Sequence, residues 1–193
     1  MQSSGNCEAG KVRAFVGLKV AGGSWLQPLT DALAGNEFPG FESLRLSPDR
    51  NLHITLKFLG SVSETAIPEL SIHLAQVCAK HQDFGFSCKG LGYFKHAIWL
   101  GIEACPALEA LASDVETCCS LLGYPADSKA YKPHVTIARF GKAAKQPLLQ
   151  LMESFAGKTW FDDTASEACL FKSETLPSGA VYSVMERYPL RSS

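Results

Sequence analysis

The hydrophobic positions of this chain follow two repeats, one of two residues and one of three to four residues. The first is typical of strands with one buried face, and the second of amphipathic helices. Strands are predicted at 14–20, 44–46, 53–60, 84–91, 97–102, 134–140, 167–172 and 180–188. Helices are predicted to about residue 34, from 63 or 65 to about 77, and over 106–122 and 147–155.

The order of these predicted elements repeats within the chain. A strand, a helix and a second strand occur over 14–60 and again over about 98–140. We infer an α+β fold of two lobes related by a pseudo-twofold axis. Each lobe would be an antiparallel sheet with helices on its outer face, and the active-site cleft would lie between the lobes.

The second strand of each repeat carries nearly the same tetrapeptide. His53-Ile54-Thr55-Leu56 returns as His134-Val135-Thr136-Ile137. Alternation predicts that Ile54, Leu56 and Phe58 face the core, whereas His53, Thr55 and Lys57 face the other way. In the second copy, His134 and Thr136 would face outward.

Two imidazoles, each beside a hydroxyl, suit general acid–base chemistry on an anionic group. One His-x-Thr strand by itself is an ordinary half-exposed strand, because Thr is common in strands and His is tolerated there. The chain has only five histidines, and two of them occupy matching positions. The matched pair therefore favours a catalytic role.

Composition is consistent with a folded enzyme. Of the 193 residues, 46% are hydrophobic and 19% are charged, which excludes global disorder. This length fits a single bilobal domain, which we assign to 13–190, with a flexible N-terminal tail at 1–12. The net charge of −1 argues against a broad nucleic-acid footprint, so an RNA substrate would be held by its end.

The cysteines and the hydropathy of the chain bear on its location. There are seven cysteines and no C-x-x-C motif, which is poor disulfide or zinc usage and fits a reducing cytosol. No stretch approaches the ~20 apolar residues that span a membrane, and the first residues lack the form of a signal peptide. We expect a cytoplasmic protein with no membrane contact and no obligate protein partner.

The motifs and their frames resemble the 2H phosphoesterases, and within them the RNA 2′,3′-cyclic phosphodiesterases, also described as 2′-5′ RNA ligases. The resemblance covers about residues 13–190. It rests on a first strand at 13–18, on the segments 52–60 and 131–139 around the two histidines, and on the closing pattern at 170–174, 179–182 and 188–190. It also implies the bilobal fold.

The resemblance implies the function and the roles of the motif residues. The substrate would be an RNA end or a nucleotide with a 2′,3′-cyclic phosphate, and the product a 2′-phosphate; the reverse reaction would be 2′-5′ ligation. His134 is expected to act as the proton acceptor and His53 as the proton donor, although the symmetry of the site makes the reverse order chemically reasonable. The Thr55 and Thr136 hydroxyls would bind the phosphate oxygens.

Three further residues are candidate substrate contacts. The family pattern implies that Arg139 contacts phosphate or nucleotide, but strict alternation would put it opposite His134, so a bulge or the strand's end must turn it. Tyr131 would stack on a base or lie in the core, and Lys57 belongs to the basic residues near the motifs. No cofactor or metal is expected, because the motifs offer only two histidines and a catalytic zinc requires about three protein ligands.

Two alternatives remain open at this stage. The chain could be a nucleotide-binding module with little turnover. It could also act on another small phosphoester, such as ADP-ribose 1″,2″-cyclic phosphate or a 2′-5′ oligoadenylate, because the motifs engage only the phosphate.

Overall fold

Nine strands and four α-helices are found in the residues that the computed structural model describes, which are 10–34, 44–94, 96–141, 145–177 and 179–192. The strands are β1 (Lys11–Lys19), β2 (Arg45–Leu46), β3 (His53–Ser63), β4 (Phe84–Phe94), β5 (Ala97–Ile102), β6 (His134–Arg139), β7 (Thr159–Ala165), β8 (Glu167–Leu176) and β9 (Gly179–Pro189). The α-helices are α1 (Leu26–Ala34), α2 (Ile67–Cys78), α3 (Pro106–Leu121) and α4 (Lys145–Ser154). Short 3₁₀ turns, η2 (Asp49–Asn51) and η3 (Glu64–Ala66), precede β3 and α2.

The described strands form one curled antiparallel sheet in the order β7-β4-β5-β6-β3-β1-β8-β9, with β2 paired to β6. The two strands that carry the repeated tetrapeptide, β3 and β6, stand in the middle. They share one Cα pair, Ile54 with Val135. This junction divides the sheet into the His53 half (β3, β1, β8 and β9) and the His134 half (β6, β5, β4, β7 and β2).

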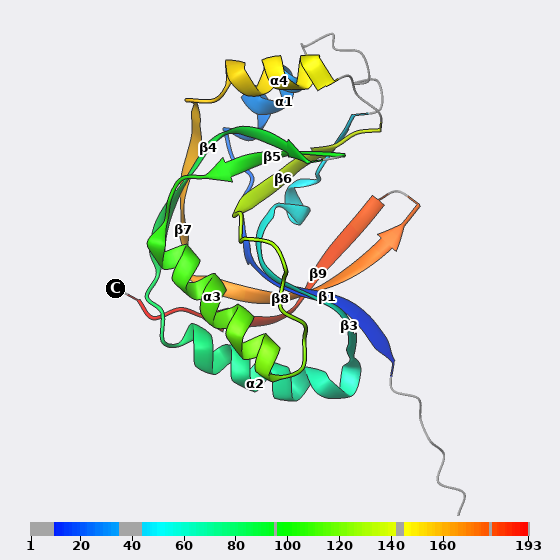
Figure 1. Cartoon of the computed structure of the whole chain (residues 1–193), viewed down its shortest axis with the longest axis vertical. Coiled ribbons are helices and arrows are strands. Elements are labelled where there is room, and N and C mark those ends of the chain that lie inside the picture. Colours follow the sequence, from blue (N-terminus) through cyan, green and yellow to red (C-terminus); the bar gives the residue numbers. More distant parts are fainter. Residues whose placement is uncertain (1–9, 35–43, 95, 142–144, 178, 193) are drawn as a thin grey trace, which may run out of the picture.

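Helices cover both halves of the sheet (Figure 1). Helix α3 packs on β3, and α2 packs on α3, β8 and β9, so both cover the His53 half. Helix α4 contacts β4 in the His134 half. The Trp25 ring, just before α1, stacks on Phe161 of β7 with the ring centroids 4.3 Å apart. Helix α1 follows β1 of the His53 half but lies at the His134 half. Helix α3 follows β5 of the His134 half but packs on the His53 half.

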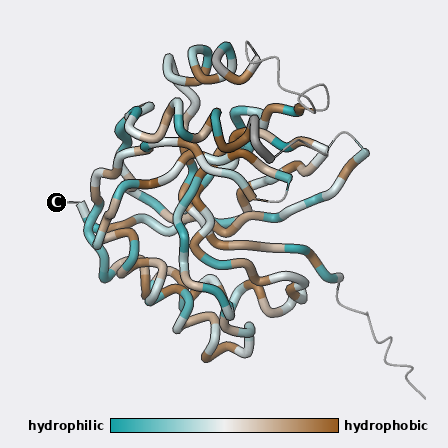
Figure 2. The backbone as a smooth tube through the Cα atoms, turned by 45° about the horizontal axis from the view of Figure 1, so that its top comes forward, coloured by the Kyte–Doolittle hydropathy of each residue, from teal (hydrophilic) through white to brown (hydrophobic). Residues whose placement is uncertain are grey.

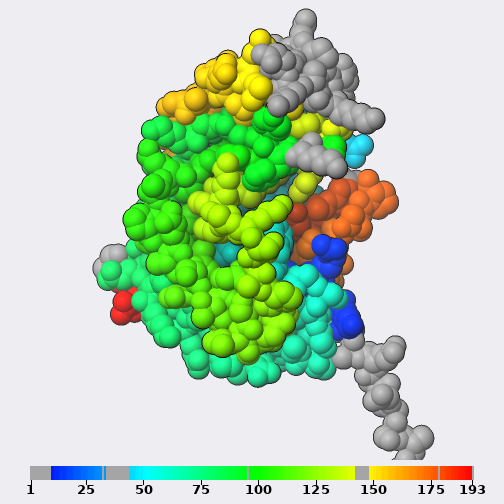
Figure 3. Space-filling view, viewed as in Figure 1, coloured from blue at the N-terminus to red at the C-terminus, as the bar shows by residue number. Residues whose placement is uncertain are grey.

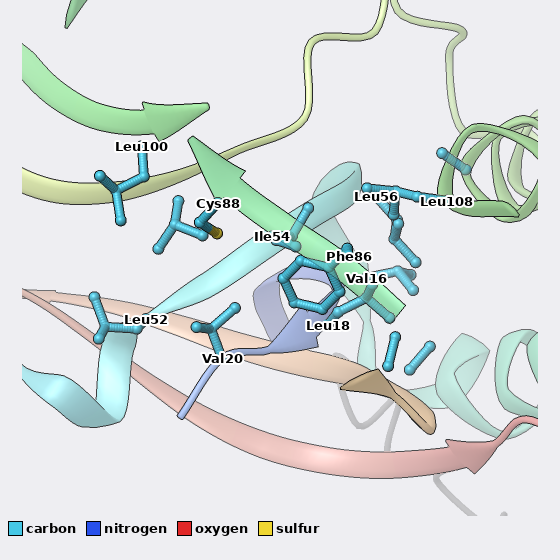
Figure 4. Packing of buried hydrophobic residues seen from close by; sticks show 14 of the residues in the cluster. Val16, Leu18, Val20, Leu52, Ile54, Leu56, Phe86, Cys88, Leu100 and Leu108 are labelled. Atoms are coloured by element: carbon cyan, nitrogen blue, oxygen red, sulfur yellow. The ribbon is translucent and has the colours of Figure 1, made fainter. Parts of the chain in front are cut away.

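One continuous hydrophobic core joins the two halves. Figure 4 shows Val16 and Leu18 of β1, Ile54 of β3, Phe86 of β4 and Leu100 of β5 converging on the same interior. Fully burying a side chain of this kind contributes about 1.5–3 kcal/mol. Hydrophobic and hydrophilic positions interchange along the strands and helices in Figure 2, as the sequence pattern requires. The core therefore fixes both halves around the β3–β6 junction.

The structure confirms the expected α+β fold with two sheet halves, and most predicted elements. It differs at β7, which the sequence analysis did not predict because Asp162 and Asp163 interrupt its apolar pattern. This strand pairs only with β4, at the edge of the sheet, where polar residues are tolerated. Residues 1–9 of the flexible tail expected at 1–12 lie outside the described residues. The boundary of this tail is wrong, because Lys11 and Val12 belong to β1 and pair with β3.

Two smaller findings concern the cysteines and the helices. The six described cysteines are free thiols, and Cys78, Cys88, Cys119 and Cys169 are buried. Burial raises the thiol pKa to about 12 for Cys78 and Cys119, so these groups are protonated at neutral pH. Among the helices described, none has the length and apolar character to cross a membrane.

Candidate active site

The two His-x-Thr pairs lie on one face of the sheet at the β3–β6 junction. Ile54 and Val135 stand opposite each other across this junction, and both are fully buried on the core side. Neighbouring residues of a strand point to the opposite face. His53 and Thr55, which flank Ile54, therefore share the other face with His134 and Thr136, which flank Val135, and all four side chains are half-buried.

Both motif strands contain a β-bulge at the same position of the tetrapeptide. In β3 the register passes from Thr55 to Lys57 and leaves Leu56 without a partner on β1. In β6 it passes from Thr136 to Ala138 and leaves Ile137 without a partner on β5. An extra residue of this kind shifts the alternation by one position. The side chains that follow each bulge are therefore displayed on the faces opposite to those that strict alternation predicts.

The two imidazoles are held in the same way. The Nδ1 atom of His53 lies 2.6 Å from the backbone oxygen of Asn51, and Nδ1 of His134 lies 2.8 Å from that of Lys132. A carbonyl oxygen only accepts, so each Nδ1 carries the proton and donates. The second nitrogen of each ring, Nε2, makes no bond to that carbonyl, so it is the nitrogen available for proton exchange.

The surroundings lower the pKa of both imidazoles below the usual 6.5. For His53, burial is the largest cause, and positive charge on His134 and Arg139 adds to it, whereas the hydrogen bond to Asn51 acts in the opposite direction. For His134, burial is again the largest cause and the Lys132 ammonium adds to it, against the hydrogen bond to the Lys132 carbonyl. A bound phosphate anion would raise both pKa values.

Aromatic rings surround His53. Its ring centroid lies 4.7 Å from that of Phe15 and 5.0 Å from that of Tyr182, which it meets edge-on. Phe15 stacks in turn on Phe171, and both belong to a small apolar cluster on this face of the His53 half. This packing removes water from one side of the imidazole and fixes the plane of its ring.

The surroundings of His134 are also aromatic, but they carry a cation. The His134 ring lies 5.0 Å from Phe94, edge-on, and 5.8 Å from Trp99. The Lys132 ammonium sits 4.5 Å above the Trp99 ring, within the range of a cation–π contact. Lys132 therefore places a positive charge beside the His134 ring.

Arg139 lies on the same face as the histidines. The bulge at Ile137 turns the Arg139 side chain onto this face, which strict alternation would not do. The Arg139 guanidinium is close enough to His53 to lower the pKa of that imidazole. Arg45 of β2 is the Cα partner of Arg139, and both are exposed. Like charges directly opposite each other in a sheet are unfavourable, and a bound anion relieves the repulsion.

The expectation that Phe58 belongs to the core is wrong. Its side chain is 63% exposed, because the bulge at Leu56 turns it onto the face of His53. It lies over Phe15, with centroids 6.0 Å apart. A cavity of about 140 Å³ beside it is lined by Phe58, Phe15, Tyr182 and Arg13, among others.

The expectation that Lys57 contacts the substrate is also corrected. The same bulge turns Lys57 to the opposite face, where it is only 1% exposed. Its ammonium donates to Glu116 Oε1 at 2.8 Å and to the Pro125 carbonyl at 2.6 Å. Lys57 is therefore part of the packing between β3 and α3.

Tyr131 is not a core residue. It is 39% exposed, and its hydroxyl donates to the backbone oxygen of Thr55 at 3.2 Å. This bond joins the segment before β6 to the first motif strand. Its role toward the substrate stays a prediction.

No group of three or more His, Cys, Asp or Glu side chains within the described ranges is arranged to hold a metal ion. Four neighbours of the histidines were not predicted from the sequence: Asn51, Phe15, Trp99 and Tyr182. Tyr182 and Phe15 fall inside segments that carry the family resemblance, and Asn51 directly precedes one, which was a usable signal; only strand pairing makes Phe15 and Trp99 neighbours of the histidines.

The chain is similar to known proteins in sequence and in fold. The 2′-5′ RNA ligase superfamily matches residues 26–174. The RNA 2′,3′-cyclic phosphodiesterase of Aquifex aeolicus is 30% identical over 148 residues, which are 73% of this chain and 79% of that protein. The protein of the same name from Methanothermobacter thermautotrophicus is 26% identical over 93% of this chain and its own entire length.

A solved structure matches the fold. The crystal structure of E. coli LigT complexed with 3′-AMP superposes with a TM-score of 0.75 at 23% identity. The match covers 94% of this chain and 99% of that one. The two proteins therefore share the same fold over nearly their whole lengths.

Proposed function

The chain belongs to the 2′-5′ RNA ligase superfamily and to its RNA 2′,3′-cyclic phosphodiesterase family, and we propose that it hydrolyses the 2′,3′-cyclic phosphate of an RNA end to a 2′-phosphate. The observation that carries this proposal is the matched setting of the two imidazoles. Each donates a hydrogen bond from Nδ1–H to a backbone carbonyl two residues earlier, which leaves two Nε2 atoms on one face for proton transfer.

The proposed reaction needs one proton acceptor and one proton donor. Neutral His134 takes a proton from water at Nε2 as the water oxygen attacks phosphorus. The bond from phosphorus to the 3′ oxygen breaks on the opposite side, and protonated His53 gives its Nε2 proton to that oxygen. The products are a 2′-phosphate and a 3′-hydroxyl, and the two histidines return to their starting states by proton exchange with solvent.

In this scheme Thr55 and Thr136 stabilise the charge that develops on the two non-bridging oxygens. Each is one residue beyond the core pair Ile54–Val135, so one hydroxyl comes from each half of the sheet. Donors of this kind are worth about 3 kcal/mol each when they are aimed at the charge of the transition state. Arg139, on the same face, adds a fixed positive charge.

We propose that the base of the terminal nucleotide lies beside His53 and the phosphate chain beside Arg139. The His53 side offers an exposed Phe58 and a cavity walled by Phe15 and Tyr182, which suit the flat face of a base. The His134 side has Lys132, Arg139 and Arg45, which suit phosphates. This arrangement fits an enzyme that holds an RNA end.

The test is end-group analysis after incubation with an RNA that ends in a 2′,3′-cyclic phosphate. A 2′-phosphate product supports the proposal, and an unchanged end or a 3′-phosphate contradicts it. Parallel reactions contain ADP-ribose 1″,2″-cyclic phosphate, a 2′-5′ oligoadenylate, and an RNA 2′,3′-cyclic phosphate end together with an RNA 5′-hydroxyl end, which would displace the 3′ oxygen in place of water. Faster turnover of one of these would assign the site to that substrate or to ligation.

A further inference from the structure

The β3–β6 junction is a narrow link between the two halves of the active site. Its ladder consists of the single pair Ile54–Val135, whereas β1 pairs with β3 over its whole length. In-line displacement at phosphorus requires that His53 and His134 stay on opposite sides of one small group. A misplacement of about 1 Å can cost about 100-fold in rate. The single ladder pair leaves this distance to the core below the junction and to the segments that connect the two halves.

The second link is the connection from 122 to 133, which runs from the end of α3 to His134. It has no regular secondary structure, and most of its residues are exposed. Figure 3 shows the yellow-green surface that includes this connection and β6 running between the lower and upper parts of the molecule. Its residue Lys132 supplies the carbonyl that holds Nδ1 of His134. The conformation of the connection thus sets the position of that imidazole.

Lys57 fastens this connection to the first motif strand. Its ammonium reaches Pro125 O at 2.6 Å and lies 3.6 Å from Asp127 Oδ2, and both residues belong to the connection. The third partner, Glu116 Oε1 at 2.8 Å, comes from α3 and also accepts from the backbone N–H of Asp127. The ammonium therefore donates two hydrogen bonds and makes a longer ion-pair contact with Asp127.

The burial of Lys57 is unusual for a residue that serves stability alone. Its side chain has no exposed area, and desolvating an ammonium costs several kcal/mol, which a buried ion pair often fails to recover. A well-packed apolar side chain would stabilise the same position at least as well. What an apolar residue cannot do is hold a backbone carbonyl and two carboxylates of neighbouring segments in one arrangement.

Tyr131 makes a second attachment, two residues along β3 from the first. Its hydroxyl donates to the backbone oxygen of Thr55 at 3.2 Å. The connection is thus tied at Lys57 near its start and at Thr55 near its end. The second attachment point is itself a residue of the first His-x-Thr pair.

We infer that Lys57 and Tyr131 are positioning residues, which tie the 122–133 connection to β3 and thereby hold His134 and Thr136 at a fixed distance from His53 and Thr55. Neither side chain needs to touch the substrate for this role. The inference rests on the proposed function only for its kinetic readout.

The test compares Lys57→Met and Tyr131→Phe with the wild-type enzyme on a nucleoside 2′,3′-cyclic phosphate, well below the melting temperature of each variant. Lys57→Met should lower kcat by ~10- to 100-fold and change KM less than about threefold, because nucleoside contacts on the His53 half remain while the alignment of the two imidazoles is lost. Tyr131→Phe leaves no charge unpaired, and it should lower kcat by ~3- to 10-fold in the same pattern. It keeps the test decisive if Lys57→Met does not fold.

The matched control is Lys89→Met, which removes the half-exposed ion pair of Lys89 with Glu103 at 2.9 Å, away from the site. Its kcat and KM should equal those of the wild type. An unchanged kcat in folded Lys57→Met and Tyr131→Phe, a rise in KM alone, or an equal loss in Lys89→Met would overturn the inference.

A second measurement does not depend on catalysis. Hydrogen exchange of the amides at 123–133 should be faster in Lys57→Met than in wild type or Lys89→Met, with the remaining strands unchanged. Unchanged exchange would overturn the inference. If the wild type turned over no cyclic phosphate, the proposed function would fall, and the exchange comparison would still decide whether Lys57 ties the connection to β3.

Discussion

The side-chain oxygen of Asn51 accepts a hydrogen bond from the backbone N–H of Tyr182 at 3.3 Å, across most of the length of the chain. The side-chain nitrogen of Asn51, Nδ2, donates to the backbone carbonyl of Ala180 at 2.7 Å. The backbone oxygen of Asn51 accepts from Nδ1 of His53, and the ring of Tyr182 meets His53 edge-on. One buried residue therefore holds both β9 and the imidazole.

Replacing Asn51 by Ala should destabilise the protein and the site together. The backbone groups of Ala180 and Tyr182 lose their partner, which costs about 1–3 kcal/mol in the free energy of unfolding. Urea denaturation measures this cost, and kcat should fall in the same variant because Tyr182 no longer fixes the His53 ring. Full stability and full activity in Asn51→Ala would contradict the proposed link.

The two motif histidines should be individually necessary for catalysis. His53→Ala and His134→Ala should each lower turnover by ~10²–10⁴-fold, the usual contribution of a positioned acid or base. The double variant should lose less than the product of the two, since the residues act as a unit. His73→Ala on α2 is the control and should be near neutral.

A substrate with an activated leaving group separates the roles within this pair. Such a group departs without a proton, so it should restore the rate of the His53 variant more than that of the His134 variant. Equal restoration, or the reverse order, would reject the assigned roles and leave the pair itself standing.

Hydrolysis should be independent of divalent metals. The proposed scheme uses two imidazoles and two hydroxyls, and needs no Lewis acid. Prolonged treatment with EDTA followed by gel filtration should leave the rate essentially intact. Loss of activity that a stoichiometric divalent ion restores would replace the acid–base account by a metal-assisted one.

The pH dependence of kcat/KM should be a bell with its maximum on the acidic side of 6.5. Its limbs report the two imidazoles of the free enzyme, and burial lowers the pKa of both. The acidic limb requires a neutral base and the alkaline limb a protonated acid, so lowering both pKa values moves both limbs toward acid. The limbs belong to the coupled pair rather than to one residue each.

The bell for kcat should lie at higher pH than the bell for kcat/KM, because the bound phosphate raises the imidazole pKa values in the complex. Initial rates between about pH 4.5 and 9 measure both curves. A kcat/KM maximum above pH 7.5 would be inconsistent with the buried setting of the two rings.

Phe58 should matter only for substrates that carry a base. Stacking is worth about 1–3 kcal/mol, so Phe58→Ala should raise KM for nucleoside 2′,3′-cyclic phosphates by ~5- to 100-fold. Ribose 2′,3′-cyclic phosphate without a base should be turned over equally by both enzymes. Ile72→Ala, at an exposed apolar residue of α2, is the matched control. An equal loss on the abasic substrate would show that Phe58 serves the phosphate site or the fold.

The two motif strands and their repeat could be predicted, because polar and apolar residues alternate in both copies of the tetrapeptide. The alternation also identified Ile54 and Val135 as core residues, and the face that His53 and His134 share follows from that. The neighbours Phe15 and Trp99 could not be predicted, because they come from strands whose pairing is set by the whole sheet.

The errors at Lys57 and Phe58 have one physical origin. A bulge leaves no mark in a hydrophobic pattern when the extra residue, here Leu56, is itself apolar. For Arg139 the conflict between the family pattern and alternation revealed the irregularity in advance. At Lys57 no conflict arose, because a basic residue beside a phosphate site agreed with both.

The crossing of helices between the halves has a consequence for how the molecule folds. Strand β1 of the His53 half continues into α1 beside the other half, and β5 of the His134 half continues into α3, which packs on β3. No cut of the chain yields one half together with the helices that cover it. The two halves are interwoven, so neither can be inherited, excised or melted as a separate unit, and His53 and His134 are brought together in the same cooperative folding event.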